Sequence, residues 1–359
     1  MHDDALLTAA ALLGSPAIEA LAVLPGSDRN RVWRARLADD RTVVVKHYRD
    51  PSLGTWRRES AALRLADGEG APRILAVSYP SDGPAVTVLE DLGDPGSLAD
   101  LLLARGADAP RRAGEGLVAW ATAIGRLHHR THGRGEEFAT ALGPGLRADA
   151  VAEEVEEAPT GLAALVAAHD LPWSDAVPAA FAEALAPLTD PADAVLSPGD
   201  ACPDNNLLAE DGARLLDFEY AQVRHRAWDA AYLRVPWPSC WCAWQVPADH
   251  AHRALASMLE ASYGGGPVPT SFAADLDAAT LLWCLVSVRW FLPGALEEPA
   301  ARNADEDRRP GRWTMVITRL ELAARTPGPE PLRRWAAETA AQLVRRWGEH
   351  ALRPAPAYR

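Results

Sequence analysis

The most informative part of this chain runs from Leu196 to Ala221 and reads L-S-P-G-D-A-C-P-D-N-N-L-L-A-E-D-G-A-R-L-L-D-F-E-Y-A. It contains two carboxylates, Asp200 and Asp217, with Asn205 between them. Residues 206–216 hold two short apolar runs around an Asp-Gly pair, a pattern that predicts a β-hairpin. Such a hairpin would carry all three polar groups to one end of a small sheet.

These three groups suit phosphoryl transfer from a nucleotide, in which the protein mainly positions the reactants and neutralises charge. Mg²⁺ prefers oxygen ligands and keeps several waters, so one carboxylate and one amide oxygen are enough. We therefore predict Asp217 and Asn205 as the metal ligands. Asp200 would face the incoming hydroxyl and act as the catalytic base. The alternative is that these residues only form turns, their commonest use.

The pattern D-x-x-x-x-N, followed by an apolar strand and D-F-E, resembles the catalytic loop and metal motif of protein-kinase-like enzymes, most closely the aminoglycoside phosphotransferase family of small-molecule kinases. The resemblance extends over roughly residues 18–232. It implies an α+β, protein-kinase-like two-lobed fold, with a small antiparallel sheet in the N-lobe and a mainly helical C-lobe. One departure is Pro198, which stands where the family has a His that braces the catalytic loop.

The resemblance also implies a reaction. The γ-phosphoryl group of ATP or GTP would be transferred, with Mg²⁺, to a hydroxyl of a small molecule. The acceptor would be aminoglycoside-like, cationic or sugar-like. The sequence does not separate amino sugars from choline-like, homoserine-like or other acceptors, nor ATP from GTP, and the oligomeric state does not follow from it either.

Residues 18–48 predict three successive strands joined by polar turns, at 18–24, 31–37 and 42–48. The first turn contains Gly26 and Ser27 and stands where the nucleotide-covering loop of the family lies. Its backbone N–H groups, with Ser27, would touch phosphate. An ordinary hairpin turn explains the segment equally well, because it contains a single glycine.

Lys46 follows three valines on the third predicted strand. Its position resembles that of the family's strand lysine, which neutralises the α and β phosphates. Glu59 lies in a predicted helix at 55–65 and would pair with Lys46 as in the kinase ion pair. The alternatives are a solvent-facing lysine on a strand and a surface glutamate beside two arginines.

The hinge between the lobes is expected after a predicted strand at 85–90. The resemblance places backbone groups of Glu90, Asp91 and Leu92 there, where they would bind the adenine. This divides the chain into an N-terminal nucleotide-binding lobe, residues 1–92, and a C-terminal catalytic and substrate-binding lobe, residues 93–359.

The second lobe is predicted to contain helices at 97–103, 115–131, 250–263, 273–291, 312–324 and 331–349. Several prolines, Pro159 among them, are expected to break the Ala-rich segment 133–193. His128 is expected to be a packed structural histidine. Asp229 resembles the family's aspartate that supports the catalytic loop through backbone hydrogen bonds, and a helix N-terminal aspartate is the alternative.

Three residues are candidates for contact with the acceptor: Glu219 in the D-F-E motif, and Trp237 and Trp241 in a Trp-rich segment. Clustered indoles can form the apolar floor on which a sugar ring or a cation packs. Core packing is the alternative for the tryptophans.

The net charge of −13 argues against a nucleic-acid partner and suits a cationic acceptor, although solubility alone explains the same charge. The four cysteines (Cys202, Cys240, Cys242, Cys284) suggest reduced thiols, and C-x-C at 240–242 lacks a second ligand pair for zinc. The apolar run 278–288 is too short to span a membrane, and no signal peptide is evident. A cytoplasmic protein without membrane contact is therefore expected.

A second class of function remains open. The missing histidine and the single-glycine loop would also suit a catalytically weak nucleotide-binding pseudokinase that acts as a regulator. Against it, every expected reactive residue is present. An interaction module made only of helices would require those residues to be coincidental.

Overall fold

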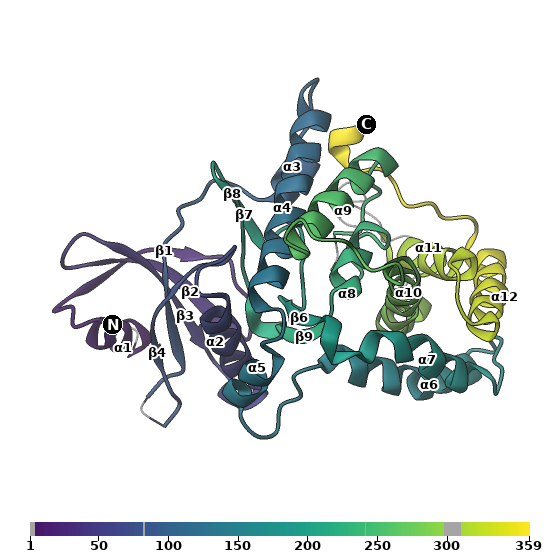
Figure 1. The fold of residues 1–359 in the computed structure, drawn as a ribbon, viewed down its shortest axis with the longest axis horizontal. Helices are drawn as coiled ribbons and strands as arrows, with labels where there is room; N and C mark the ends of the chain where they lie inside the picture. Colours follow the sequence, from purple (N-terminus) through teal and green to yellow (C-terminus); the bar gives the residue numbers. More distant parts are fainter. Residues whose placement is uncertain (1–3, 82, 241, 298–309) are drawn as a thin grey trace.

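The computed structural model describes residues 4–81, 83–240, 242–297 and 310–359. A small sheet-containing lobe at the N-terminal end lies beside a larger helical lobe (Figure 1). The expected α+β, kinase-like two-lobed architecture is confirmed.

The small lobe is built on one antiparallel sheet with the strand order β1-β2-β3-β5-β4. Its strands are β1 Ile18–Leu24, β2 Asn30–Leu37, β3 Thr42–Tyr48, β4 Ile74–Ser78 and β5 Val86–Glu90. Alternation decides the faces: Val43 and Val45 on β3 are buried on the side covered by helix α1 (Asp4–Leu12). Helix α2 (Thr55–Ala66) packs beside the sheet and carries Glu59 inward, where only 2% of that residue is exposed.

The large lobe is mainly helical. Its helices are α3 Leu98–Leu103, α4 Ala109–Thr131, α5 Gly135–Leu142, α6 Ala150–Ala168, α7 Val177–Leu185, α8 Ala227–Ala230, α9 Ala248–Ser262, α10 Phe272–Glu297, α11 Arg312–Arg325 and α12 Glu330–Trp347. Two short antiparallel pairs accompany them, β6 (Ala194–Ser197) with β9 (Gln222–His225), and β7 (Asn206–Ala209) with β8 (Gly212–Leu215). The β7–β8 pair is the hairpin that the sequence predicts.

Two features of the large lobe differ from expectation. The pair β6–β9 was not predicted, because the loop that carries Asp200 and the β7–β8 hairpin separate its two strands in the sequence. Pro159 does not break its segment but lies inside α6. A helix-interior proline costs about 3 kcal/mol, and the buried neighbours Val155 and Leu162 offset this by packing into the lobe's core.

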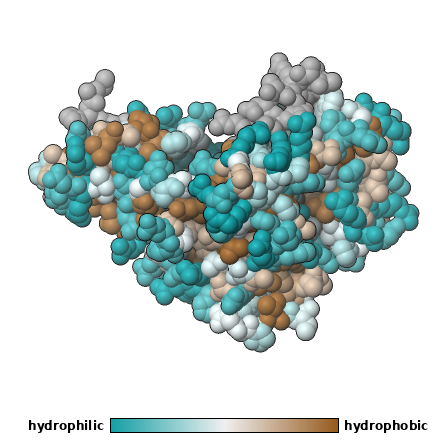
Figure 2. Space-filling model, turned by 90° about the horizontal axis from the view of Figure 1, so that it is seen from above, coloured by the Kyte–Doolittle hydropathy of each residue, from teal (hydrophilic) through white to brown (hydrophobic). Residues whose placement is uncertain are grey.

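Helix α10 is longer than the apolar run 278–288. Among the described residues it is the one helix long and apolar enough to cross a membrane, but 67% of its most apolar window is buried inside the protein. It lies within the helical lobe in Figure 1. The face seen in Figure 2 is mostly hydrophilic, with apolar residues scattered over it. This helix therefore has the burial of a core helix.

Candidate functional site

The β7–β8 hairpin and the loop before it hold three predicted site residues together. The Asn205 side chain donates from Nδ2 to the backbone carbonyl of Asp200 at 3.1 Å, and Leu216 N donates to the Asn205 carbonyl at 2.9 Å. Asp217 follows directly, with a left-handed backbone (φ 59°). Asn206, which is not among the predicted site residues, anchors the loop by accepting from Leu98 N at 3.0 Å.

Lys46 connects the two lobes at this place. Its Nζ lies 2.7 Å from Glu59 Oε2 and 2.6 Å from Asp217 Oδ1. Tyr48 OH donates to the same Glu59 oxygen at 2.7 Å. Burial alone would lower the pKa of Lys46, but the carboxylates of Glu59 and Asp217 outweigh it and hold the pKa above its usual value. A charged ammonium group is therefore held beside Asp217.

The turn between β1 and β2 reaches the D-F-E motif. Ser27 N donates to Asn30 Oδ1 at 3.2 Å, which closes the turn that begins at Gly26. Arg29 Nη2 lies 2.6 Å from Glu219 Oε1, and Asn30 Nδ2 donates to Glu219 Oε2 at 3.2 Å. Glu219, predicted as an acceptor contact, is only 2% exposed and joins the two lobes in this structure.

The predicted hinge follows strand β5. Glu90 is paired with Val43 of β3, and its N–H already donates to the Arg73 carbonyl at 3.0 Å. The Asp91 carboxylate lies 2.9 Å from Arg34 Nε, which fixes the first residue after the strand. Adenine binding by Glu90, Asp91 and Leu92 stays a prediction.

Asp200 is partly buried on the loop after β6. Ser239 Oγ donates to Asp200 Oδ1 at 2.6 Å, and Tyr232 OH lies 2.7 Å from Ser239 Oγ and 3.2 Å from the Gly199 carbonyl. Burial raises the pKa of Asp200 to about 6, the Ser239 hydrogen bond opposes the rise, and the Asp204 and Asp217 charges add to it. Ser239 gave no signal in the sequence, because it is brought to Asp200 only by the fold.

The raised pKa leads to a pH prediction. Protonated Asp200 cannot accept a proton, so kcat/KM should fall about tenfold per pH unit below a midpoint near 6. Ser239→Ala removes the hydrogen bond that lowers this pKa, so the midpoint should move to higher pH. Steady-state kinetics across acidic and neutral pH measure both profiles. The unchanged protein and the Ser239→Ala variant are compared with the same nucleotide, so titration of the nucleotide cannot shift one midpoint relative to the other. Identical midpoints in the two proteins would therefore contradict Asp200 as the titrating group.

The side chain of Asp229 braces the loop that carries Asp200. Its oxygens lie 2.7 Å from Ser197 Oγ, 2.5 Å from Arg224 Nη2 and 2.8 Å from His128 Nε2. Ser197 Oγ in turn accepts from Gly199 N at 3.0 Å. The described partners are thus side chains rather than the backbone groups expected, and Asp229 lies inside α8 rather than at its N-cap.

This arrangement supports the loop without the family's histidine. His128 is buried, as expected of a packed histidine. Gly199, at φ +81°, is required by the close approach of Tyr220, since a Cβ there would stand 1.8 Å from the Tyr220 carbonyl oxygen. Ser197, one residue before Pro198, supplies the hydroxyl that bonds Asp229.

Replacing Asp229 with Asn is expected to cost about 3–5 kcal/mol of folding free energy, because it leaves the buried Arg224 charge unpaired. Burial alone would raise the pKa of Asp229, but Arg224 and His128 outweigh it and hold the pKa well below its usual range. This stabilisation is therefore complete above the unfolded pKa of about 3.9 and is lost as the pH falls below it. Urea unfolding at neutral and acidic pH measures it.

The matched control is Asp67→Asn. Asp67 pairs with Arg130 on the surface, where its side chain is 69% exposed, so the change should cost about 0–1 kcal/mol. Equal losses in the Asp67 and Asp229 variants would contradict the bracing role.

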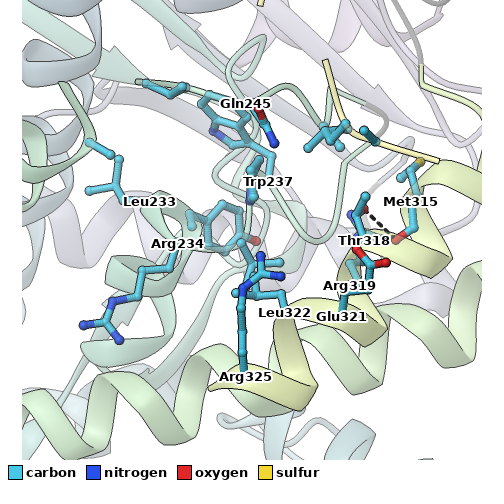
Figure 3. Close-up of a pocket in the computed structure, with 18 of the residues that line it drawn as sticks. Leu233, Arg234, Trp237, Gln245, Met315, Thr318, Arg319, Glu321, Leu322 and Arg325 are labelled. Carbon is cyan, nitrogen blue, oxygen red and sulfur yellow. Dashed lines mark hydrogen bonds between the residues drawn. The ribbon is translucent and has the colours of Figure 1, made fainter. Parts of the chain in front are cut away.

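The Trp-rich segment packs into the large lobe. Trp237, with φ 42°, is 1% exposed, and its ring lies edge-on to those of Trp120 and Trp244. Its indole therefore packs in the core, and it also lines the cavity beside helix α11 (Figure 3), so contact with an acceptor stays a prediction. Trp241 lies outside the described residues.

A cavity of about 400 Å³ lies between this segment and helix α11 (Figure 3). Basic side chains dominate its charged lining, with Arg234, Arg319 and Arg325 against a single acidic one, Glu321. None of the predicted catalytic or metal residues lines it. Its charge does not suit a cationic acceptor.

The expectation of four reduced thiols is wrong for two of them. Cys202, two residues after Asp200, forms a disulfide with Cys240 of the Trp-rich segment, with their Cα atoms 5.9 Å apart. The two cysteines are 38 residues apart, and only the fold brings them together. The expectation that C-x-C lacks a second pair of possible ligands is also wrong, because Cys202 and Asp204 lie next to Cys240 and Cys242.

The two lobes, with the Lys46 cluster between them, have the fold of kinase-like phosphotransferases. Residues 21–254 match the phosphotransferase enzyme family (APH), and since they make up well over half of the 359 residues, the chain belongs to that family. The comparison with curated proteins finds no match.

Solved structures share the fold. The macrolide 2'-phosphotransferase MphH from Brachybacterium faecium is 21% identical, with a TM-score of 0.50 over 91% of this chain and 99% of its own. The amicoumacin kinase hAmiN, solved with AMP-PNP and Ca²⁺, is 14% identical (TM-score 0.55; 93% and 97%). A Plasmodium vivax ethanolamine kinase is 13% identical (TM-score 0.53; 89% and 84%). At these identities the likeness shows the fold alone.

Proposed function

We propose that this enzyme transfers the γ-phosphoryl group of ATP or GTP to a hydroxyl group of a small cationic or sugar-like acceptor. The observation that carries the proposal is the Lys46 cluster. A buried ammonium group on the small lobe contacts both Glu59 and Asp217, at 2.7 and 2.6 Å. Phosphoryl transfer needs such a cation beside the metal-binding carboxylate.

The donor set suits Mg²⁺. Asp217 offers a carboxylate that is 36% exposed, and Asn205 offers an amide whose nitrogen is already donated to the Asp200 carbonyl. Because the amide nitrogen makes this bond, the amide oxygen is the atom left to bind a metal. The carboxylate and the amide oxygen are both hard donors, of the kind that Mg²⁺ takes together with phosphate oxygens and waters. Bound there, the ion would neutralise charge on the phosphates.

The remaining steps belong to side chains of this chain. Lys46, held by Glu59, would neutralise the α and β phosphates once Asp217 turns to the metal. Asp200 would accept the proton of the acceptor hydroxyl while that oxygen attacks the γ-phosphorus. The bond from the γ-phosphorus to the β–γ bridging oxygen would break, and the nucleoside diphosphate would leave. Gly26 and Ser27 would cover the phosphates, and the bonds from Arg29 and Asn30 to Glu219 would hold this cover against the large lobe. Closure of this kind excludes water and aligns the reactants.

The acceptor class is supported by charge. A formal net charge of −13 favours the approach of cations over that of anions. Among proteins of the same fold, one is named for ethanolamine and another for a macrolide. The basic cavity beside α11 does not fit a cation, so the cationic part of an acceptor would bind elsewhere.

The test is consumption of ATP or GTP with Mg²⁺ by the purified protein and a panel of amino sugars, amino alcohols, macrolides and neutral sugars. Consumption stimulated by one class of acceptor, with a phosphorylated product, would identify the substrate. Nucleotide binding, without consumption stimulated by any member of the panel, would favour a catalytically weak pseudokinase that acts as a regulator. Failure to bind any nucleotide would reject the proposal.

A further inference from the structure

A cluster of three cysteines and one aspartate lies next to the catalytic loop and has no part in the proposed reaction. Cys202 and Asp204 belong to that loop, and Cys240 and Cys242 to the Trp-rich segment. One donor atom of each residue, three Sγ and one carboxylate oxygen, lies within 4.8 Å of all the others. The three cysteines are at most 3% exposed, and Asp204 is exposed.

This donor set is that of a zinc site. Three thiolates and a carboxylate are four ligands, the number a closed structural site uses. A Zn–S distance of about 2.3 Å puts the ligands of a tetrahedral ion about 3.8 Å apart, so four atoms within 4.8 Å of one another can surround it. Soft thiolates select zinc over Mg²⁺, which separates this cluster from the oxygen ligands Asn205 and Asp217.

We propose that Cys202, Cys240, Cys242 and Asp204 form a zinc site when the Cys202–Cys240 disulfide is reduced. The disulfide occupies two of the three sulfurs, so the disulfide and the metal exclude each other. Reduction takes two electrons and two protons from two molecules of a thiol reductant, which become a disulfide. Zinc then displaces the protons of the three thiols.

The disulfide and the zinc ion would each connect the same two segments, the loop with Cys202 and the Trp-rich segment with Cys240. Ser239 precedes Cys240 and donates to Asp200, two residues before Cys202. A zinc ion bound by both segments would therefore keep Ser239 at the catalytic carboxylate after the disulfide is opened. The site would be structural, without an open position for substrate.

The experiment uses the full chain, reduced with a thiol reductant until four thiols react with a thiol reagent, and then freed of reductant. Titration with Cd²⁺ and Co²⁺ should show one equivalent bound, with thiolate-to-cadmium charge-transfer absorption and the visible spectrum of tetrahedral Co²⁺. Zn²⁺ should displace both. The disulfide-containing protein should show neither signal.

Variants assign the ligands. Cys242→Ala should weaken metal binding by at least about 100-fold, because even loss of an outer-shell partner costs about 10- to 100-fold. Asp204→Asn should weaken it while leaving the fold intact, since this residue is exposed. Cys284→Ala is the matched control: Cys284 is a buried cysteine of α10 outside the cluster, and its loss should leave binding unchanged.

Three outcomes would overturn the site. They are a disulfide that the thiol reductant leaves intact in the folded protein, a fully reduced protein without the charge-transfer absorption, and equal affinity in the Cys242 and Cys284 variants. None of these readouts depends on the phosphoryl-transfer activity.

Discussion

Replacing Asp200 with Asn is expected to lower acceptor-stimulated turnover by about 10²- to 10⁴-fold, the usual contribution of a positioned general base. An asparagine has the same shape and can still accept the Ser239 hydrogen bond, so the loop should keep its structure. Nucleotide affinity should change little, because Asp200 would contact the acceptor hydroxyl rather than the phosphates. Turnover by steady-state kinetics and nucleotide binding by calorimetry separate the two effects.

The outcome decides between two roles for Asp200. If turnover stayed at the level of the unchanged protein, another group would have to accept the proton. If nucleotide affinity fell together with turnover, Asp200 would act through the metal or the fold. A loss of turnover alone, beside an unchanged unfolding temperature, is what a catalytic base requires.

Much of the fold could be predicted because its signals are local. Strands β1 and β3 match the predicted ranges residue for residue, since alternating or β-branched runs end at clear turn residues. The pair β6–β9 could not be predicted, because each strand has only four residues and the pairing joins segments that are far apart in the chain. The prediction for Pro159 was wrong because the packing of α6 into the core outweighs the tendency of proline to end a helix.

The site divides in the same way. Lys46, Asn205 and Asp217 stand in motifs that fix their order and spacing, so the sequence could nominate them. The sequence alone does not mark Ser197 and Ser239 as site residues, because a serine becomes informative only when the fold places its hydroxyl 2.6–2.7 Å from a carboxylate, here those of Asp229 and Asp200. Contacts between distant segments carry no local pattern.

The spacing of the cysteines in the sequence does not show which of them lie together in the fold. The spacing of C-x-C at 240–242 does not predict a zinc site, because no second ligand pair stands nearby in the sequence. The fold supplies Cys202 and Asp204 from a loop about forty residues earlier. Ligand pairs that join separate segments are invisible until the segments are placed together.

Replacing Asp217 with Asn is expected to reduce metal-dependent turnover by about 10³-fold. Metal stabilisation of a transferring phosphoryl group is worth several kcal/mol, and about 1.4 kcal/mol corresponds to a factor of ten. Unlike Asp200→Asn, this change should also weaken nucleotide binding in the presence of Mg²⁺, because the metal joins the protein to the phosphates. Calorimetry with and without Mg²⁺ measures that difference directly.

Asp211→Asn is the matched control, because this exposed carboxylate lies in the turn of the same hairpin and pairs only on the surface, with Arg214. It should change neither turnover nor affinity. In the Asp217 variant, Lys46 loses one of its two carboxylate partners but keeps Glu59 at 2.7 Å, so the charge that faces the phosphates remains. Nucleotide affinity without Mg²⁺ should therefore persist or rise. If it fell as far as the affinity with Mg²⁺, Asp217 would act by positioning Lys46 and not by holding the metal.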